Sequence, residues 1–174
     1  MTKQRVVFSR EEITARVREL GRAISTDYAG RSLVVIGILN GAFIFLADLV
    51  REIDLDIEVD FLRVASYGNA TASSGTLRFS KDIELDIRGK DVLLVEDIID
   101  TGRTMAALKG VLADKEAASV RTCVLIDKRE RREVEVAADY AGFVCHEGFL
   151  VGYGLDHAER HRQYPEIRCI VQEA

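Results

Sequence analysis

Residues 92–105 read VLLVEDIIDTGRTM, and this stretch decides the fold. The uninterrupted apolar run 92–95 has the composition of a strand that is buried on both faces. A helical pattern begins near Thr104, and Gly102 permits a tight turn between strand and helix. A strand, a glycine turn and a helix start are typical of a phosphate site. Three carboxylates nevertheless stand at this position: Glu96, Asp97 and Asp100.

Expected strands and helices alternate along the rest of the chain. Apolar runs predict strands at 5–8, 33–39, 57–67, 77–79, 91–95, 120–126, 141–145 and 168–171. Helical patterns follow a capping box of Ser9 and Glu12 and extend over 43–53 and 104–114. Buried strands that alternate with helices predict an α/β fold, with a mostly parallel sheet flanked by helices.

Composition limits the possible classes of protein. The 174 residues suffice for one domain, and the net charge of −5 comes from interleaved acids and bases, which argues against a nucleic-acid surface. The apolar region 34–50 contains Asn40 and Asp48 and is shorter than the roughly 20 residues of a membrane span. The first residues contain no apolar stretch of signal-peptide length. We therefore expect a cytoplasmic protein that binds neither nucleic acid nor membrane.

Unusual residues follow three of the predicted strands, at 39–41, 96–104 and 127–129. In parallel sheets, ligands bind at the carboxyl ends of the strands. These segments are far apart in the sequence but would meet at one edge of the sheet. The sequence therefore predicts a binding site there.

Residues 101–104 have the features of a phosphate cup. Backbone N–H groups at the helix start favour an anion, and Gly102 allows close approach of the backbone to a ligand. Hydroxyl groups of Thr101 and Thr104 and the charge of Arg103 would add to this preference. Neither the Walker pattern nor the dinucleotide-binding glycine pattern is present.

The carboxylates need a different ligand group. Acids at a strand end can accept hydrogen bonds from a vicinal diol, and they favour positive charge that develops on a sugar ring. A phosphate cup beside Glu96 and Asp97 therefore predicts recognition of a ribose 5-phosphate group. Asp100 would then face whatever lies above the anomeric carbon of the sugar.

Segment 92–104 closely resembles the phosphoribosyl-diphosphate binding motif of type I phosphoribosyltransferases, with the closest match to the hypoxanthine-guanine branch. The resemblance continues, in the order of the family, through LNGAFIFLADL (39–49), RVASYG (63–68), LIDKR (125–129) and FLVGYGLD (149–156). It implies a type I phosphoribosyltransferase fold in a single domain, 1–174. A core at about 30–130 would carry a small hood formed by about 1–10 and 131–174.

The resemblance also implies roles for individual residues. Glu96 and Asp97 would lie by the ribose hydroxyls, residues Asp100 to Thr104 would hold the 5-phosphate, and Asp100 would be the general base and acid near N7 of the purine. The remaining assignments are Leu39, Asn40, Gly41 and Arg162 for pyrophosphate; Lys128, Phe149, Leu150 and Asp156 for the purine; Ser66 and Tyr67 for a lid; and Asp156, Glu96 and Asp97 for Mg²⁺.

Two loops have further expected properties. In the family, the loop matching 39–41 commonly contains a non-proline cis peptide. Many relatives have lysine where this chain has Asn40, so backbone N–H groups and metal are expected to bind pyrophosphate there. The small, polar segment 68–75 has the composition of a loop that could close over the reacting centre and exclude water.

The implied function is purine salvage. The enzyme would transfer the 5-phosphoribosyl group from phosphoribosyl diphosphate to hypoxanthine or guanine, giving IMP or GMP and pyrophosphate, with Mg²⁺ as cofactor. Relatives form dimers or tetramers, so a homodimer or homotetramer is expected. Two alternatives stay open: a regulatory protein of the same fold that senses nucleotides or binds RNA, and a phosphoribosyltransferase for another base.

Two further patterns have ordinary explanations. His157 and His161 are four residues apart, but their context does not match the zinc-protease motif, and a solvated helical face is the preferred interpretation. The run KRERRE at 128–133 is interpreted as an exposed turn, apart from Lys128.

Overall fold

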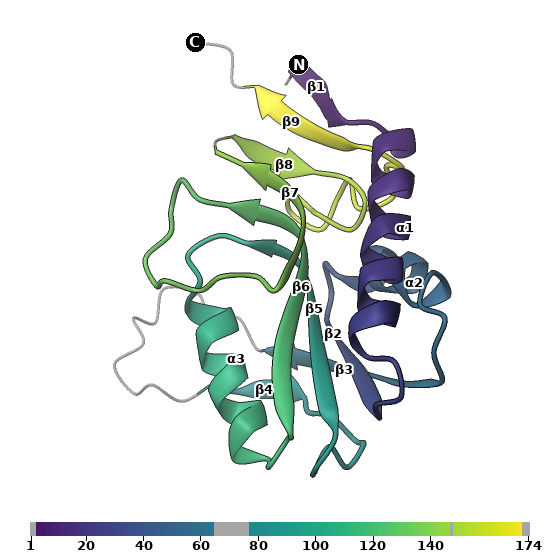
Figure 1. Cartoon of the computed structure of the whole chain (residues 1–174). Coiled ribbons are helices and arrows are strands. Elements are labelled where there is room, and N and C mark those ends of the chain that lie inside the picture. Colours follow the sequence, from purple (N-terminus) through teal and green to yellow (C-terminus); the bar gives the residue numbers. More distant parts are fainter. Residues whose placement is uncertain (1–2, 65–76, 147, 172–174) are drawn as a thin grey trace.

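The computed structural model describes residues 3–64, 77–146 and 148–171 (Figure 1). Its larger sheet has six strands in the order β4-β3-β2-β5-β6-β7. In chain order these are β2 (Leu33–Ile38), β3 (Ile57–Val64), β4 (Phe79–Lys81), β5 (Asp91–Ile99), β6 (Ser119–Lys128) and β7 (Tyr140–Cys145). Within this sheet, only the edge strand β4 runs antiparallel to its neighbour. The predicted mostly parallel sheet is therefore confirmed.

Helices cover both faces of this sheet (Figure 1). The helices are α1 (Arg10–Asp27), α2 (Phe43–Arg51) and α3 (Arg103–Asp114). In β5, Leu93 and Val95 pack into the core of α1 and α2, whereas Val92 and Leu94 pack into the core of α3. Side chains of a strand alternate between faces, so a strand covered on both sides reads as an uninterrupted apolar run.

The predicted capping box begins α1. The Ser9 hydroxyl accepts a hydrogen bond from the backbone N–H of Glu12 at 3.2 Å. The Glu12 carboxylate accepts one from the backbone N–H of Ser9 at 2.7 Å. These bonds satisfy two N–H groups that the first helical turn leaves without intrahelical partners.

A smaller antiparallel sheet joins the two ends of the chain. It contains β1 (Lys3–Phe8), β9 (Ile167–Val171) and β8 (Phe149–Val151), in that order. Figure 1 shows it above the larger sheet. Its strands come from the segments that the resemblance assigned to a hood, whereas β7 belongs to the larger sheet. The boundary between core and hood stays a prediction.

Several predicted boundaries were wrong. β5 extends to Ile99 and β6 to Lys128, because these two strands continue to pair beyond their apolar runs, up to Ile99 opposite Asp127. Glu96 and Asp97 are therefore strand residues. The β4 strand begins at Phe79, and the short β8 strand was not predicted at all.

The predicted helical face at His157 and His161 was also wrong. Residues 153–165 form successive turns, and an isolated antiparallel β-bridge pairs His157 with Arg160. His161 has a φ of +79°, which no right-handed helix contains. Among the described residues, no helix combines the length and the apolar character that crossing a membrane requires.

Candidate active site

The predicted phosphate cup lies between the end of β5 and the start of α3. Gly102 is the N-cap of α3 with a φ of +84°, and it supplies no side-chain acceptor to the first helical turn. The Arg103 N–H donates to the Thr101 hydroxyl at 3.4 Å, and the other N–H groups of that turn are available to an anion. The Thr101 carbonyl accepts hydrogen bonds from the N–H groups of Glu133 and Val134, at 2.9 and 3.0 Å. The following segment thus fixes the turn from outside.

The Arg103 side chain, which was expected to bind phosphate, pairs with an acidic residue. Its guanidinium forms an ion pair with Glu133, and 63% of its side chain is exposed. In this arrangement the positive charge of Arg103 is paired with Glu133 and lies at the surface. An anion at 101–104 would therefore be bound mainly by the backbone N–H groups.

In the acid pair of β5, Asp97 is buried and Glu96 is half-buried. Asp97 is 9% exposed, its N–H donates to Glu96 Oε1 at 3.1 Å, and the N–H of Ile98 donates to Asp97 Oδ1 at 2.9 Å. Burial raises the pKa of Glu96 well above 4.5, and the charge of Asp97 adds to this effect. Burial also raises the pKa of Asp97. Such a pair favours a cation or hydroxyl donors beside it.

The loop at 39–41 packs directly on this pair. A Cβ atom at Gly41 would lie 1.8 Å from Asp97 Oδ2, and a Cβ atom at Gly154 would lie 2.1 Å from the Gly41 carbonyl oxygen. Only glycine permits this stacking. The peptide bond between Leu39 and Asn40 is cis, in agreement with the resemblance.

Arg162 and Asp156 lie at the same edge. The Arg162 guanidinium donates to the Gly154 carbonyl at 2.8 Å, and it forms ion pairs with Asp156 at 3.1 Å and with Glu159 at 2.9 Å. Its charge opposes the effect of burial on the pKa of Asp97. Two segments that are distant from β5 in the sequence thus meet the acid pair.

The donor atoms at this edge fit Mg²⁺. The described residues contain no cluster of three or more protein ligands. Mg²⁺ nevertheless prefers one or two carboxylates together with waters and substrate phosphates. Glu96, Asp97 and Asp156 offer hard oxygen donors, and the negative charge of the buried pair would be reduced by a cation.

Asp100 and Lys128 meet at the ends of adjacent parallel strands. Ile99 pairs with Asp127, and one guanidinium, that of Arg132, donates to the Asp100 carbonyl at 3.1 Å and to the Lys128 carbonyl at 3.0 Å. Asp100 Oδ1 is buried and has no hydrogen-bond partner among the described residues. Buried polar atoms in proteins are usually hydrogen-bonded, so this oxygen can accept a hydrogen bond from a ligand or from water.

The other groups near these two residues are charged. Arg131 approaches Asp100 Oδ2 at 3.4 Å from an exposed position. The side chain of Lys128 is 11% exposed, and its ammonium group lies 3.2 Å from the carboxylate of Glu130. The ammonium group is therefore held near the strand ends.

Phe149 and Leu150 come from the smaller sheet. Leu150 is buried, whereas the Phe149 side chain is 50% exposed and packs edge-on against His157, with ring centroids 5.1 Å apart. Part of the Phe149 ring is therefore available to a planar ligand. The predicted lid residues Ser66 and Tyr67 lie outside the described residues.

Arg132 is a site residue that the sequence interpretation missed. Its side chain is 19% exposed and lies inside the wall of the site. Besides the two carbonyls at the strand ends, its acceptors are Asp127 Oδ1 at 2.5 Å, Val136 O at 2.7 Å and Ile99 O at 3.4 Å. The available signal was indirect: Asp127 ends an apolar strand, and a buried acid needs a cationic partner nearby.

Comparisons with known proteins agree with this geometry. The sequence model of the phosphoribosyl transferase domain family matches residues 8–158. The hypoxanthine-guanine phosphoribosyltransferase of Aquifex aeolicus is 48% identical over 97% of this chain and 95% of its own length. The solved structure of a hypoxanthine-guanine phosphoribosyltransferase from Bacillus anthracis has a TM-score of 0.92 at 42% identity, covering 98% of this chain and 100% of that chain.

Some relatives are much longer. The bifunctional protein TilS/HprT of Listeria monocytogenes is 46% identical over 98% of this chain. The chain spans about a quarter of the length of that relative, with 26% covered.

The acid pair yields a prediction about stability and pH. Folding raises the pKa of Glu96 above 4.5, so the folded protein retains a proton that the unfolded chain has lost. Stability contributed by this group therefore falls as the pH rises above about 4.5, until the group ionises in the folded state. The substitution Glu96→Gln removes this penalty. Its Tm advantage over the wild type should grow by at least ~2 °C between pH 5 and pH 8.

Thermal unfolding at several pH values measures this difference. The substitution Glu135→Gln, at an exposed position, is the control and should show no such trend. A Tm advantage of Glu96→Gln that shrinks with rising pH would contradict the proposed effect of burial.

Arg132 yields a second prediction. The substitution Arg132→Met removes the shortest charged partner of the buried Asp127 and the hydrogen bonds that Arg132 donates to four backbone carbonyls. It should lower the free energy of unfolding by about 3–5 kcal/mol. The substitution Arg129→Met is the matched control. Arg129 also pairs with Asp127, at 3.1 Å, but its side chain is 59% exposed. This control should cost less than about 1 kcal/mol. Urea denaturation compares the two, and equal losses would refute the structural role of Arg132.

Proposed function

The chain belongs to the phosphoribosyl transferase family, in its hypoxanthine-guanine branch, and from this membership we propose that it is a purine salvage enzyme. It transfers the 5-phosphoribosyl group of phosphoribosyl diphosphate to hypoxanthine or guanine, giving IMP or GMP and pyrophosphate. The observation that supports this function best is the buried Asp100 Oδ1, which has no partner among the described residues and lies between an anion cup and Lys128. A purine N–H and a sugar phosphate satisfy these groups together.

The sugar phosphate is bound at the end of β5. Backbone N–H groups of 101–104 bind the 5-phosphate, with the hydroxyls of Thr101 and Thr104 as additional donors. Glu96 and Asp97 accept hydrogen bonds from the ribose hydroxyls. Their negative charge also stabilises the positive charge that develops on the ring when the bond to pyrophosphate breaks.

The purine lies against Asp100, Lys128 and β8. As its ring nitrogen forms the bond to the anomeric carbon, Asp100 accepts the proton released from N7 and returns it in the reverse reaction. The Lys128 ammonium donates to the 6-oxo group, Phe149 stacks on the ring and the backbone at Leu150 meets the base edge. A 6-oxopurine is favoured because an ammonium group donates but cannot accept a hydrogen bond.

The leaving group is bound on the opposite side of the sugar. The backbone of Leu39, Asn40 and Gly41 and the guanidinium of Arg162 hold pyrophosphate. Asp156, Glu96 and Asp97 would hold Mg²⁺, which neutralises charge on the leaving oxygens when bound. Closure of a lid that includes Ser66 and Tyr67 would exclude water from the activated sugar.

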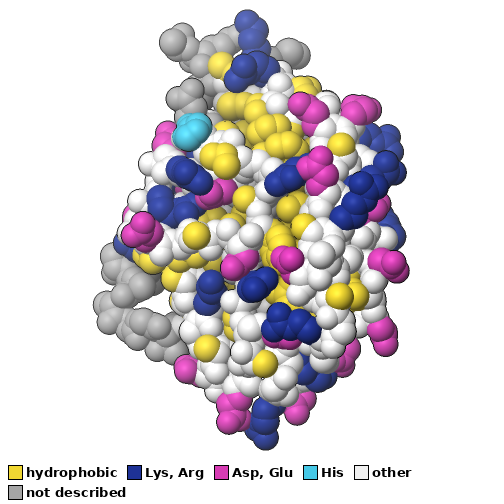
Figure 2. All heavy atoms as spheres, viewed as in Figure 1, with side chains coloured by type: hydrophobic (Ala, Val, Ile, Leu, Met, Phe, Trp, Pro, Cys, Tyr) yellow, Lys and Arg dark blue, Asp and Glu magenta, His cyan; other side chains and the backbone are white. Residues whose placement is uncertain are grey.

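Assembly and location are further parts of this proposal. We expect a homodimer or homotetramer in the cytoplasm. In the hypoxanthine phosphoribosyl transferase of Trypanosoma cruzi, which is 36% identical, the C-terminal region has a role in the oligomeric state of that enzyme. Figure 2 shows cationic and anionic side chains interleaved on the visible face, which gives no support to the alternative of an RNA-binding regulator.

Asp100 can be tested by a nearly isosteric change. In Asp100→Asn the side-chain volume is retained, but the group can no longer accept the purine proton. The turnover number should fall by about 10²–10⁴-fold, because positioned proton transfer contributes a factor of this size. A spectrophotometric assay of IMP formation, with far-ultraviolet circular dichroism as a control for folding, measures the change. A rate near that of the wild type would contradict the proposed role of Asp100 as the general base.

The substrate class can be tested with a panel. Hypoxanthine, guanine, xanthine, adenine and uracil are each supplied with Mg²⁺ and phosphoribosyl diphosphate, and pyrophosphate release is followed. We expect turnover with 6-oxopurines and at least ~100-fold lower kcat/KM with adenine, whose amino group cannot accept from Lys128. Turnover of uracil alone would favour a pyrimidine enzyme. RNA binding at physiological salt without turnover of any base would favour the regulatory alternative.

A further inference from the structure

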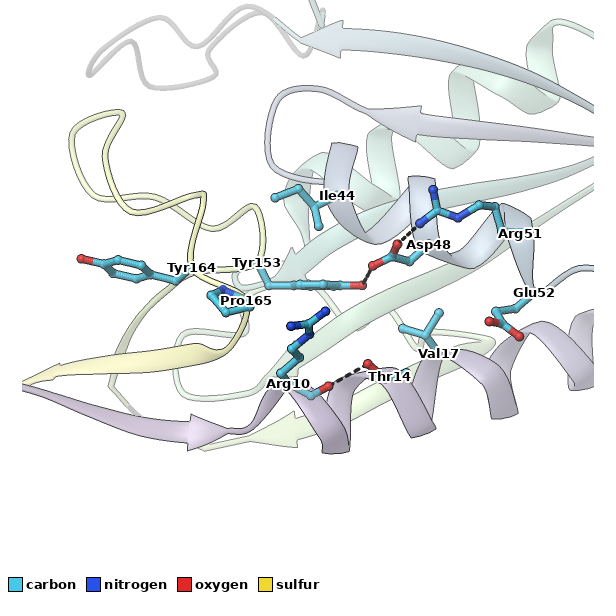
Figure 3. A pocket seen from close by; sticks show the side chains of 10 residues that line it. All are labelled: Arg10, Thr14, Val17, Ile44, Asp48, Arg51, Glu52, Tyr153, Tyr164 and Pro165. Atoms are coloured by element: carbon cyan, nitrogen blue, oxygen red, sulfur yellow. Dashed lines mark hydrogen bonds and ion pairs between the residues drawn. The ribbon is translucent and has the colours of Figure 1, made fainter.

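A pocket lies between α1, α2 and the turns at 153–165 (Figure 3). Its volume is about 430 Å³. The ring of Tyr153 reaches into it, and its hydroxyl donates a hydrogen bond to Asp48 Oδ2. None of the residues that line this pocket has a role in the proposed reaction. The pocket therefore lies on a side of the turns at 153–165 that carries none of the residues proposed to bind the substrates.

Tyr153 has an unusual backbone conformation. Its φ is +50°, and its neighbours Gly152 and Gly154 have φ values of +100° and +101°. The left-handed region is unfavourable for a residue with a Cβ atom, and it persists where the surrounding structure enforces it. The Tyr153 side chain is only 7% exposed, and its hydroxyl is bound to Asp48. The Tyr153 N–H also donates to the Tyr164 carbonyl at 2.8 Å. Burial, this backbone bond and the bond to Asp48 together hold the turn in its conformation.

The backbone of the same turn touches the site. Gly154 packs on the Gly41 carbonyl so closely that a Cβ atom would lie 2.1 Å from the oxygen. The Gly154 N–H donates to the Arg162 carbonyl at 2.9 Å, and the Gly154 carbonyl accepts from the Arg162 guanidinium. Asp156 follows two residues later. A shift of Tyr153 would therefore move three groups proposed to bind pyrophosphate and Mg²⁺.

Asp48 is connected to the site through its helix. It lies on α2, which begins at Phe43, two residues after Gly41. Its second oxygen accepts from Arg51, so the carboxylate is held on both sides (Figure 3). The Tyr153–Asp48 bond thus joins the helix that follows the 39–41 loop to the turn that precedes Asp156.

We propose that Tyr153 is a positioning residue for the pyrophosphate end of phosphoribosyl diphosphate, acting through its hydrogen bond to Asp48. The bond fixes the spacing between the 39–41 loop and the turn that carries Asp156. Tyr153 touches no substrate, because its ring lies in the pocket behind these segments. This inference rests on the proposed function.

A second tyrosine provides a matched control. The Tyr140 hydroxyl donates to Asp27 Oδ2 at 2.6 Å, and the Tyr140 side chain is 8% exposed. This bond joins β7 to the C-terminal end of α1. Neither residue belongs to the site. The Tyr140 hydroxyl also accepts a longer hydrogen bond, of 3.4 Å, from the Arg121 guanidinium. Tyr140→Phe and Tyr153→Phe each remove a tyrosine–aspartate bond from equally buried rings, and the two bonds lie in different parts of the fold.

The experiment compares steady-state kinetics of the two variants with the wild type. Both should lower the Tm by a few °C. Only Tyr153→Phe should raise the KM for phosphoribosyl diphosphate, by about 10-fold, while the KM for hypoxanthine changes by less than about twofold. Isothermal titration with phosphoribosyl diphosphate and Mg²⁺ should give a Kd that is weaker by a similar factor.

Asp48→Ala tests the pair from its other side and keeps the aromatic ring in place. It should raise the same KM, although it also removes the contact of Asp48 with Arg51. The double variant Tyr153→Phe/Asp48→Ala should be no worse than the more affected single variant, because both changes remove the Tyr153–Asp48 bond. The single variant Asp48→Ala also tests the positioning role if Tyr153→Phe does not fold. Additive effects of the two changes would overturn the proposal.

The outcomes distinguish a failure of the positioning role of Tyr153 from a failure of the proposed function. An active wild type with equal KM values for phosphoribosyl diphosphate in Tyr153→Phe and Tyr140→Phe would overturn the positioning role alone. A wild type that turns over no purine would overturn the proposed function, and the positioning role with it.

Discussion

The burial of β5 in the middle of the larger sheet is the constraint on which the site depends. β5 pairs with β2 on one side and β6 on the other, and helices cover both of its faces. A strand held in this way cannot shift its register without moving its apolar side chains to the wrong face. Glu96 and Asp97 lie on this strand and Asp100 directly follows it, so their positions are fixed mainly by the pairing of the strand and the burial of its apolar side chains.

Two adjacent carboxylates, Glu96 and Asp97, lie at a site with little access to solvent. Burial disfavours ionised carboxylates, and the Glu96–Asp97 pair has raised pKa values for that reason. Neighbouring segments lessen the effect without neutralising it: a backbone N–H group donates to Asp97, and Arg162 lies near enough to oppose the shift. The remaining negative potential is what a metal ion and a sugar with developing positive charge would use. A more stable arrangement at this position would be a poorer binding site.

Two features of the wall of the site were visible only in three dimensions. Arg132 lies in a run of charged residues that looks like an exposed turn, yet its guanidinium binds the carbonyls at the ends of β5 and β6. Tyr153 lies in an apolar segment that looks like ordinary packing, yet it has a left-handed backbone and binds Asp48. The partners of both residues are distant in sequence or are backbone atoms, and residue patterns do not record such partners.

The sequence by itself determined the α/β class, the helices on both faces and the order of acids, glycine and threonines after Val95, because period, propensity and turn chemistry are local properties. It also carried the family resemblance that assigned residues to phosphate, ribose and purine. Only the tertiary structure decided where β5 and β6 end, that residues 153–165 form turns, and that Gly41 lies between Asp97 and Gly154. Strand pairing and close backbone contacts depend on segments that meet only after folding, and no local pattern contains that information.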